Sequence, residues 1–158
     1  MSTIRKYLLL PLIFIVAYLT TFWFDWQYKF LIIKYYKCFT DGKIHFNGKP
    51  FFFFPTGYFS LSFGLYCTAL AFILLIKDTK KKLLKVVVTL ITFFLSMAII
   101  SYINSNADLI ECTACSNGER NLRYSEVPYD TIFIESLAIS LLIFFLLDAV
   151  MKRNQLKK

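Results

Sequence analysis

The chain has 158 residues, of which 58% are hydrophobic and 19% aromatic. A typical soluble domain is roughly 45–50% apolar, and a water-soluble core of this size could not hide all 18 Phe and 10 Tyr, so the composition excludes an ordinary soluble protein. The net charge of +8 is explained by anchoring beside anionic lipid, and the sequence has no basic groove interleaved with aromatic residues, so we expect no nucleic-acid binding.

Four apolar stretches are long enough to cross a bilayer, which takes about 20 residues in a helix. Every backbone polar group must be satisfied inside hydrocarbon, so we predict that each stretch is a helix. The predicted fold is therefore all-α, a single integral membrane four-helix bundle over residues 1–158. The predicted spans are residues 7–24, 58–76, 83–103 and 131–151.

Lysine distribution predicts the orientation of these spans. Five lysines crowd residues 77–85, whereas the five lysines of the first long loop are spread over residues 29–49. The positive-inside rule therefore places both termini in the cytoplasm and residues 25–57 and 104–130 in two outer loops. The expected location is a plasma membrane, as in the bacterial inner membrane.

The first outer loop carries its own structural signals. Residues 26–36 mix aromatic, aliphatic and lysine side chains, which suits an amphipathic extension lying in the interface. Two turn signals, Asp41-Gly42 and Asn47-Gly48, flank the alternating residues 43–46. This pattern predicts a short β-hairpin in the first extracytoplasmic loop.

The second outer loop contains Cys112 and Cys115 in a Cys-x-x-Cys spacing. An oxidising compartment favours a structural disulfide between them, and Cys38 of the first loop is another partner to consider. The alternative is a redox pair that cycles between dithiol and disulfide, with a quinone as the only cofactor to expect. A metal site would need four converging ligands, with Cys38 and His45 completing the set, so we expect no metal.

Four spans with an outer dithiol give this chain a topology that resembles the quinone-linked thiol oxidases and the vitamin K epoxide reductase group. The first family carries a Cys-x-x-Cys in its first outer loop, where this chain has only Cys38. The second group carries the pair within a helix. The resemblance covers topology and one cysteine spacing, and we assign the chain to neither family.

Glu135 is the only ionisable side chain well inside a predicted span. Ser101, Tyr102 and Asn104 near the outer end of the third span would meet it if spans three and four pack antiparallel. We expect this intramembrane polar cluster to be the site, if the protein has one, since ionisable groups in membranes are costly and usually functional. The alternative is a Glu135 close enough to the interface to reach water or a tyrosine hydroxyl.

Ser60, Gly64 and Thr68 recur at four-residue spacing in the second span. Small residues at this spacing form a face that lets helix backbones approach closely, so we predict a helix-packing role for them.

These features favour a multi-pass accessory, interaction or immunity-type membrane protein with ordered extracytoplasmic loops. Its expected partners are the lipid bilayer and either a protein bound through the outer loops or further copies of the chain. The sequence has no phosphate-binding or dinucleotide-binding glycine motif and no histidine-based metal motif, so we expect no enzymatic activity. The alternatives are a membrane thiol-disulfide oxidoreductase that uses Cys112 and Cys115, and a small transporter or oligomeric channel that involves Glu135.

Overall fold

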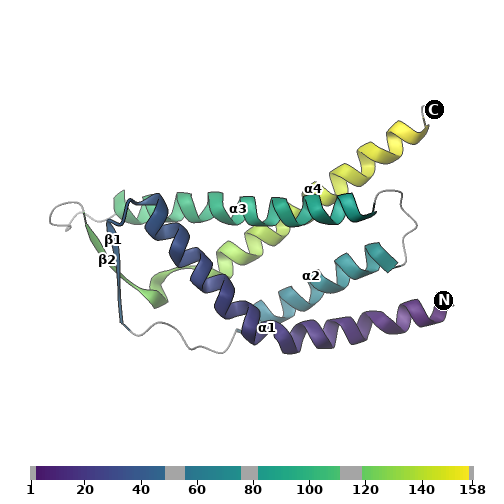
Figure 1. Cartoon of the computed structure of the whole chain (residues 1–158), viewed down its shortest axis with the longest axis horizontal. Coiled ribbons are helices and arrows are strands. Elements are labelled where there is room, and N and C mark those ends of the chain that lie inside the picture. Colours follow the sequence, from purple (N-terminus) through teal and green to yellow (C-terminus); the bar gives the residue numbers. More distant parts are fainter. Residues whose placement is uncertain (1–2, 49–55, 76–81, 111–118, 157–158) are drawn as a thin grey trace.

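The computed structural model describes residues 3–48, 56–75, 82–110 and 119–156 (Figure 1). Four helices dominate this part of the chain, as predicted, and two short strands and one 3-10 turn connect them. The helices are α1 (Thr3–Phe39), α2 (Gly57–Leu75), α3 (Lys82–Ile110) and α4 (Tyr129–Leu156). The smaller elements are β1 (Ile44–Asn47), β2 (Arg120–Arg123) and η2 (Tyr124–Glu126).

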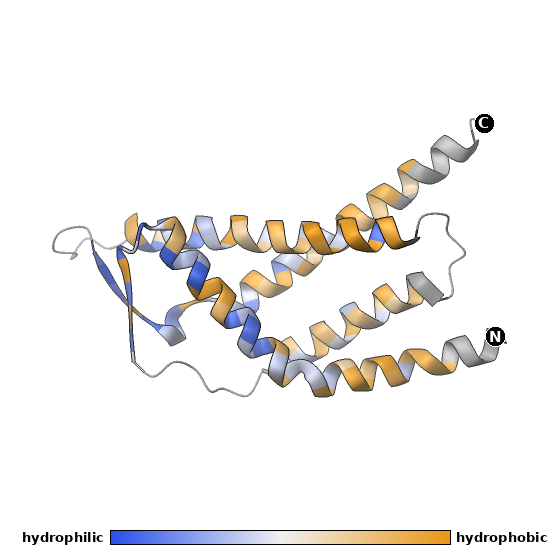
Figure 2. Ribbon diagram, in the orientation of Figure 1, coloured by the Kyte–Doolittle hydropathy of each residue, from blue (hydrophilic) through white to orange (hydrophobic). Residues whose placement is uncertain are grey.

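Three helices in the described residues are long and apolar enough to cross a membrane, which confirms the membrane class. They cover Leu8–Phe39, Leu83–Ile110 and Tyr124–Leu147. Large apolar side chains are exposed along them, where lipid rather than water suits them. The hydropathy colouring concentrates hydrophilic positions at one end of the molecule, around the strands and the adjoining half of α1 (Figure 2).

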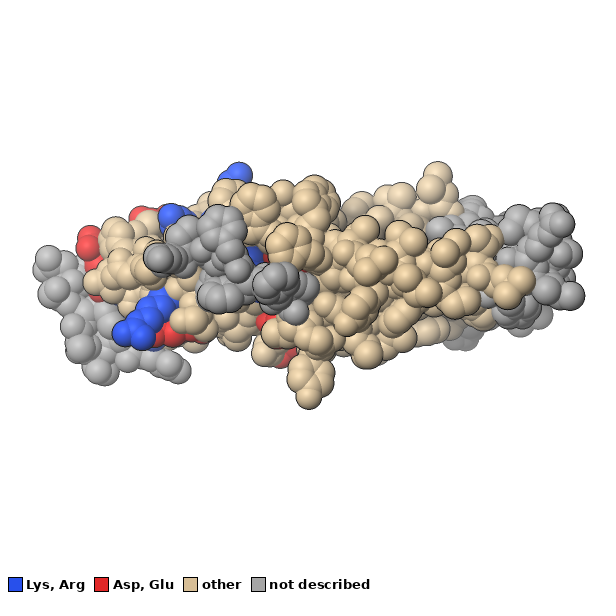
Figure 3. Space-filling model, turned by 90° about the horizontal axis from the view of Figure 1, so that it is seen from below, with Lys and Arg blue, Asp and Glu red and all other residues tan. Residues whose placement is uncertain are grey.

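Charged side chains follow the same division. On the face drawn in Figure 3, the described Lys, Arg, Asp and Glu residues gather at one end, and the neighbouring stretch of surface carries none. An uncharged belt beside a charged end is the surface expected where a protein leaves the hydrocarbon of a bilayer.

The helix α1 continues well beyond Phe24, the predicted end of the first span. Residues 25–39, expected in the first loop, extend this helix. It ends in a Schellman-type turn, in which the Gly42 N–H donates to the Lys37 carbonyl oxygen at 3.0 Å and Asp41 adopts a positive φ of 50°. The Asp41-Gly42 turn signal therefore terminates a helix.

A bend divides α1 about midway (Figure 1). The hydroxyls of Thr20 and Thr21, at the middle of the helix, both donate to the Ala17 carbonyl oxygen at 3.0 Å. Back-bonding of Ser and Thr hydroxyls to a preceding turn bends helices. We attribute the bend to these two threonines.

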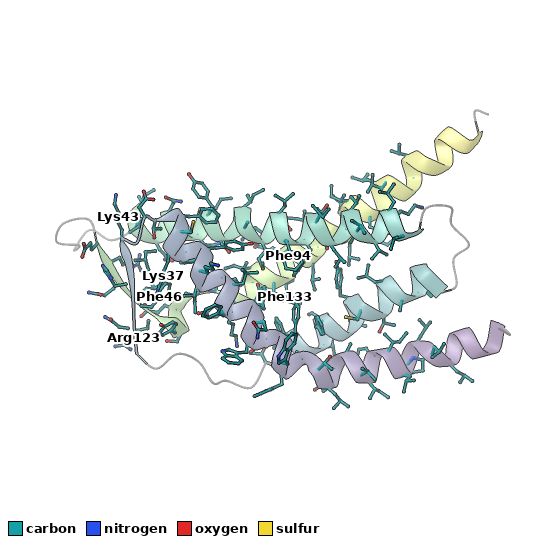
Figure 4. All side chains as sticks on the ribbon, in the orientation of Figure 1. Lys37, Lys43, Phe46, Phe94, Arg123 and Phe133 are labelled. Atoms are coloured by element: carbon teal, nitrogen blue, oxygen red, sulfur yellow. The ribbon has the colours of Figure 1, made fainter. Side chains whose placement is uncertain are left out.

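The core at the bend is aromatic and draws on all four helices. Phe133 of α4 lies at its centre, with its ring centroid 4.2 Å from Phe59, 5.1 Å from Tyr28 and 5.8 Å from Phe93 (Figure 4). Phe24 of α1 also contacts this group through Phe133, at 6.3 Å. Tilted and edge-on ring pairs at these distances stabilise packing beyond the area that they bury.

The two strands form one parallel sheet, with Ile44 opposite Arg120 and Asn47 opposite Arg123. The strand predicted around residues 43–46 is present, but its partner comes from the second loop. In the described residues the predicted hairpin does not form, because the first loop uses its Asp41-Gly42 turn to end α1 and β1 pairs with β2.

Residues 37–48, 104–110 and 119–128 thus form one folded unit, which we call the cap. It combines the C-terminal end of α1, the end of α3, both strands and η2. The cap adjoins the aromatic core.

Candidate functional site

At the start of its second half, α1 buries one charge pair and exposes two large aromatic side chains. Asp25 and Lys29 are only 1% and 8% exposed, whereas Trp26 and Phe30 are 53% and 64% exposed. The Lys29 Nζ donates to Asp25 Oδ2 at 2.7 Å, an i,i+4 pair along the helix. This inverted pattern is the one expected of a helix whose outer face meets lipid.

The start of α4 packs beside this charge pair. The Tyr28 hydroxyl donates to the Tyr129 carbonyl oxygen at 3.0 Å, which joins α1 to α4. The Lys29 Nζ also lies 5.8 Å from the centre of the Tyr129 ring, within the range of a cation–π contact.

Thr56 links the start of α2 to the first turn of α4. Its hydroxyl accepts the Phe59 N–H at 3.1 Å, the arrangement of a helix N-cap, and donates to Asp130 Oδ2 at 3.0 Å. Asp130 lies in the first turn of α4, where a carboxylate is favoured by the helix dipole. We call the set the polar clasp. Its members are Asp25, Tyr28, Lys29, Thr56, Tyr129 and Asp130.

The polar clasp holds three helices together at the level of the bend. Within the described residues, Asp25 Oδ1 is buried and accepts no hydrogen bond, so this carboxylate can take one further donor. A charge pair with hydrogen bonds suits the positioning of these three helices.

The cap is fastened by contacts between its two loops. The Arg120 N–H donates to the Lys43 carbonyl oxygen at 2.9 Å, and the Arg120 guanidinium donates to the Asp108 carbonyl oxygen at the end of α3. His45 Nε2 lies 3.3 Å from Glu119 Oε2, and both side chains are exposed.

Phe46 fills the space between the sheet and α1. The Lys37 Nζ lies 5.9 Å from the centre of the Phe46 ring, and the Tyr124 ring stacks on Phe46 at 5.2 Å (Figure 4). Ile44 and Leu122, one from each strand, are both 1% exposed. These apolar residues of the cap belong to the same core as the buried residues of the four helices.

The structure does not gather the predicted intramembrane polar cluster. Glu135 and Tyr102 are exposed, whereas Ser101 is buried. The Asn104 side chain donates to the Ile100 carbonyl oxygen of its own helix at 2.9 Å. These four side chains therefore share no interaction within the described residues.

Serines of α4 contact the neighbouring helices instead. The Ser136 carbonyl oxygen is 3.5 Å from the Ser96 hydroxyl of α3, and the Ser140 hydroxyl is 3.4 Å from the Tyr66 hydroxyl of α2. The four-residue spacing of Ser136 and Ser140 is a sequence signal for this face, since small polar residues favour close helix contacts in membranes.

The predicted packing face of α2 lies against α1. A Cβ added at Gly64 would come within 2.8 Å of the Phe14 ring, so only glycine gives this ring its space. Ser60 is buried, and the Thr68 hydroxyl donates to the Gly64 carbonyl oxygen at 2.8 Å.

The predicted cysteine pair, Cys112 and Cys115, lies outside the described residues. Cys38 is an exposed free thiol of the cap, and Cys67 is a partly exposed free thiol of α2. Among the residues that the structure describes, no group of three or more His, Cys, Asp or Glu side chains could hold a metal ion.

No protein-family model matches this chain, and neither a curated protein nor a solved structure matches it.

Proposed function

We propose that this protein is a membrane-embedded interaction subunit of the accessory or immunity type, which binds a protein partner through its cap. The observation that carries this proposal is the pairing of β1 with β2, since it joins two loops that are remote in sequence into one unit. An ordered unit whose apolar residues join the core of the four helices exceeds what a simple connection between helices requires.

The surface of the cap suits recognition of another protein. His45, Asn47, Asn121 and Arg123 are exposed along the two strands. In the described residues the sheet has two strands, so each keeps one edge to which a partner strand could add.

The topology proposed for this function has four spans in a plasma membrane, both termini in the cytoplasm and the cap outside. The 19 residues of α2 would measure about 28 Å at 1.5 Å per residue, close to the thickness of the hydrocarbon core. The lysines of residues 77–85 support a cytoplasmic position for the connection between α2 and α3.

Site-specific photo-crosslinking in the native membrane tests the function. A photoreactive amino acid at Asn47 or at Asn121 should give the same discrete adduct, identified by mass spectrometry. The matched control places it at Leu95, a residue of α3 that is 57% exposed on the apolar surface and should give no such adduct. Absence of an adduct at both cap positions, or the same adduct at Leu95, would overturn the proposal.

A further inference from the structure

One face of α4 is exposed along most of its apolar length. Its residues follow the i, i+4, i+7, i+11 spacing that places side chains on one side of a helix. They are Thr131, Glu135, Ala138 and Leu142, all exposed. The opposite side of α4, with Phe133 and Ser140, is buried in the bundle.

Glu135 of this face lies at the depth of the apolar belt. The hydrogen bond from Tyr28 to Tyr129 sets those two residues at one level. On α1, Trp26 and Phe30 flank this level and are both largely exposed, so the apolar surface extends to it and past it. Glu135 lies six residues further along α4, about 9 Å deeper at 1.5 Å per residue.

A carboxylate at this depth needs a partner. Ionisable side chains in hydrocarbon almost always pair with another group or line a polar path. Glu135 makes no hydrogen bond or ion pair within the described residues, and its short side chain cannot reach the interface as a lysine would. The buried serines of α4, Ser136 and Ser140, lie on the side of this helix that packs into the bundle.

We propose that this face of α4 binds a transmembrane helix of a partner protein that presents a Lys or Arg side chain at the depth of Glu135. Charge complementarity favours a cationic partner helix over a second copy of this chain. A second copy related by a two-fold axis would oppose Glu135 with another Glu135, two like charges in a medium of low dielectric constant. Thr131 and Ala138 are small, which lets the backbone of a partner helix approach closely.

This inference rests on the proposed interaction function and adds a second contact, within the membrane. Its test uses the full chain in lipid vesicles with synthetic poly-Leu/Ala transmembrane helices as probes. One probe carries a single Lys at the matched depth, one carries Gln there, and one carries the Lys two residues away, on another face. Association is measured by energy transfer between labels on the protein and on the probe.

The matched Lys probe should bind at least about fivefold more tightly than either other probe, as an interhelical polar contact predicts. E135Q, which keeps shape and removes charge, should abolish this preference, and Ala138→Leu should weaken binding of the matched probe. The control Leu95→Phe, on the exposed face of α3, should change neither result. The inference would be overturned by equal binding of all three probes or by an unchanged preference in E135Q. It would also be overturned if two copies of the protein associated more tightly with each other than with the Lys probe.

The two proposals can fail separately. Cap adducts without a preference for the Lys probe would defeat this inference alone, whereas a Lys preference without cap adducts would defeat only the proposed function.

Discussion

Asp25 and Lys29 place a complete charge pair on the buried face of α1, beside the first turn of α4. Burying two charges has a desolvation cost that their mutual attraction offsets only in good geometry. A distance of 2.7 Å and the Tyr129 ring near the ammonium provide that geometry. The pair is therefore more sensitive to losing one member than to losing both.

Replacing one member of this pair should destabilise the protein strongly. Lys29→Met leaves the Asp25 carboxylate buried without its ammonium, at an expected cost of about 3–5 kcal/mol in the free energy of unfolding. The double variant Asp25→Leu with Lys29→Met removes both charges and should recover most of that loss. Unfolding in detergent micelles measures each value.

Lys34→Met serves as the control, because Lys34 is exposed on the same helix. It should change stability by less than about 0.5 kcal/mol. A double variant that is less stable than Lys29→Met would show that the clasp does not depend on charge pairing.

At the scale of elements, α1 and α2 meet where the Phe14 ring covers Gly64. Gly64→Ala should destabilise the protein by about 1–3 kcal/mol, because the new Cβ would lie 2.8 Å from the ring, so that the ring or the two helices must shift. Shortening the ring in Phe14→Leu should restore part of the loss. Unfolding of the two single variants and the double variant gives the coupling between the positions.

Gly57→Ala is the matched control at the start of α2, where an added Cβ meets nothing within 4 Å. Alanine favours helix over glycine, so this variant should be unchanged or slightly more stable. If both glycine variants behaved alike, the close approach of α1 and α2 at Gly64 would be refuted.

The register of the sheet can be tested by engineered cysteines. His45 faces Asn121 in the parallel pairing, and both are exposed. In a variant with Cys38, Cys112 and Cys115 changed to Ser, H45C with N121C should form a disulfide on mild oxidation. Loss of the two engineered thiols to alkylation, while Cys67 remains free, is measured by mass spectrometry and reports the bond.

The out-of-register pair H45C with R123C is the control. Two residues along a strand separate positions by roughly 6.6 Å, which places these two cysteines beyond easy bonding distance. Equal oxidation of the two pairs would contradict the parallel register.

At the scale of the whole molecule, the hydropathy of the sequence predicted the helices and the membrane class. The helices and the membrane class follow from long apolar stretches such as residues 83–103, because each helix satisfies its own backbone. The end of α1 did not follow from hydropathy. If Asp25 and Lys29 are taken to lie in water, they predict that the membrane span ends before residue 25. Their four-residue spacing, continued by buried Ile32 and Tyr36, is the signal that the helix goes on.

Contacts between remote segments were the part that the sequence could not predict. The alternation at residues 43–46 predicts a strand, but the neighbouring sequence does not predict that this strand pairs with β2. The buried face of α4 is likewise decided by Phe133 packing against three other helices, and this packing leaves Glu135 on the outside. A polar residue in a span predicts a contact without predicting which side of the helix makes it.

The orientation of the cap is the premise of the proposed function, and Cys38 tests it most directly because its thiol is exposed in the cap. In right-side-out membrane vesicles, a variant with Cys112 and Cys115 changed to Ser is treated with a membrane-impermeant maleimide. A second variant that also carries Cys38→Ser and K80C reports the segment between α2 and α3. We predict labelling at Cys38 in sealed vesicles and labelling at the residue 80 thiol only after permeabilisation. The opposite pattern would place the cap in the cytoplasm and contradict the account.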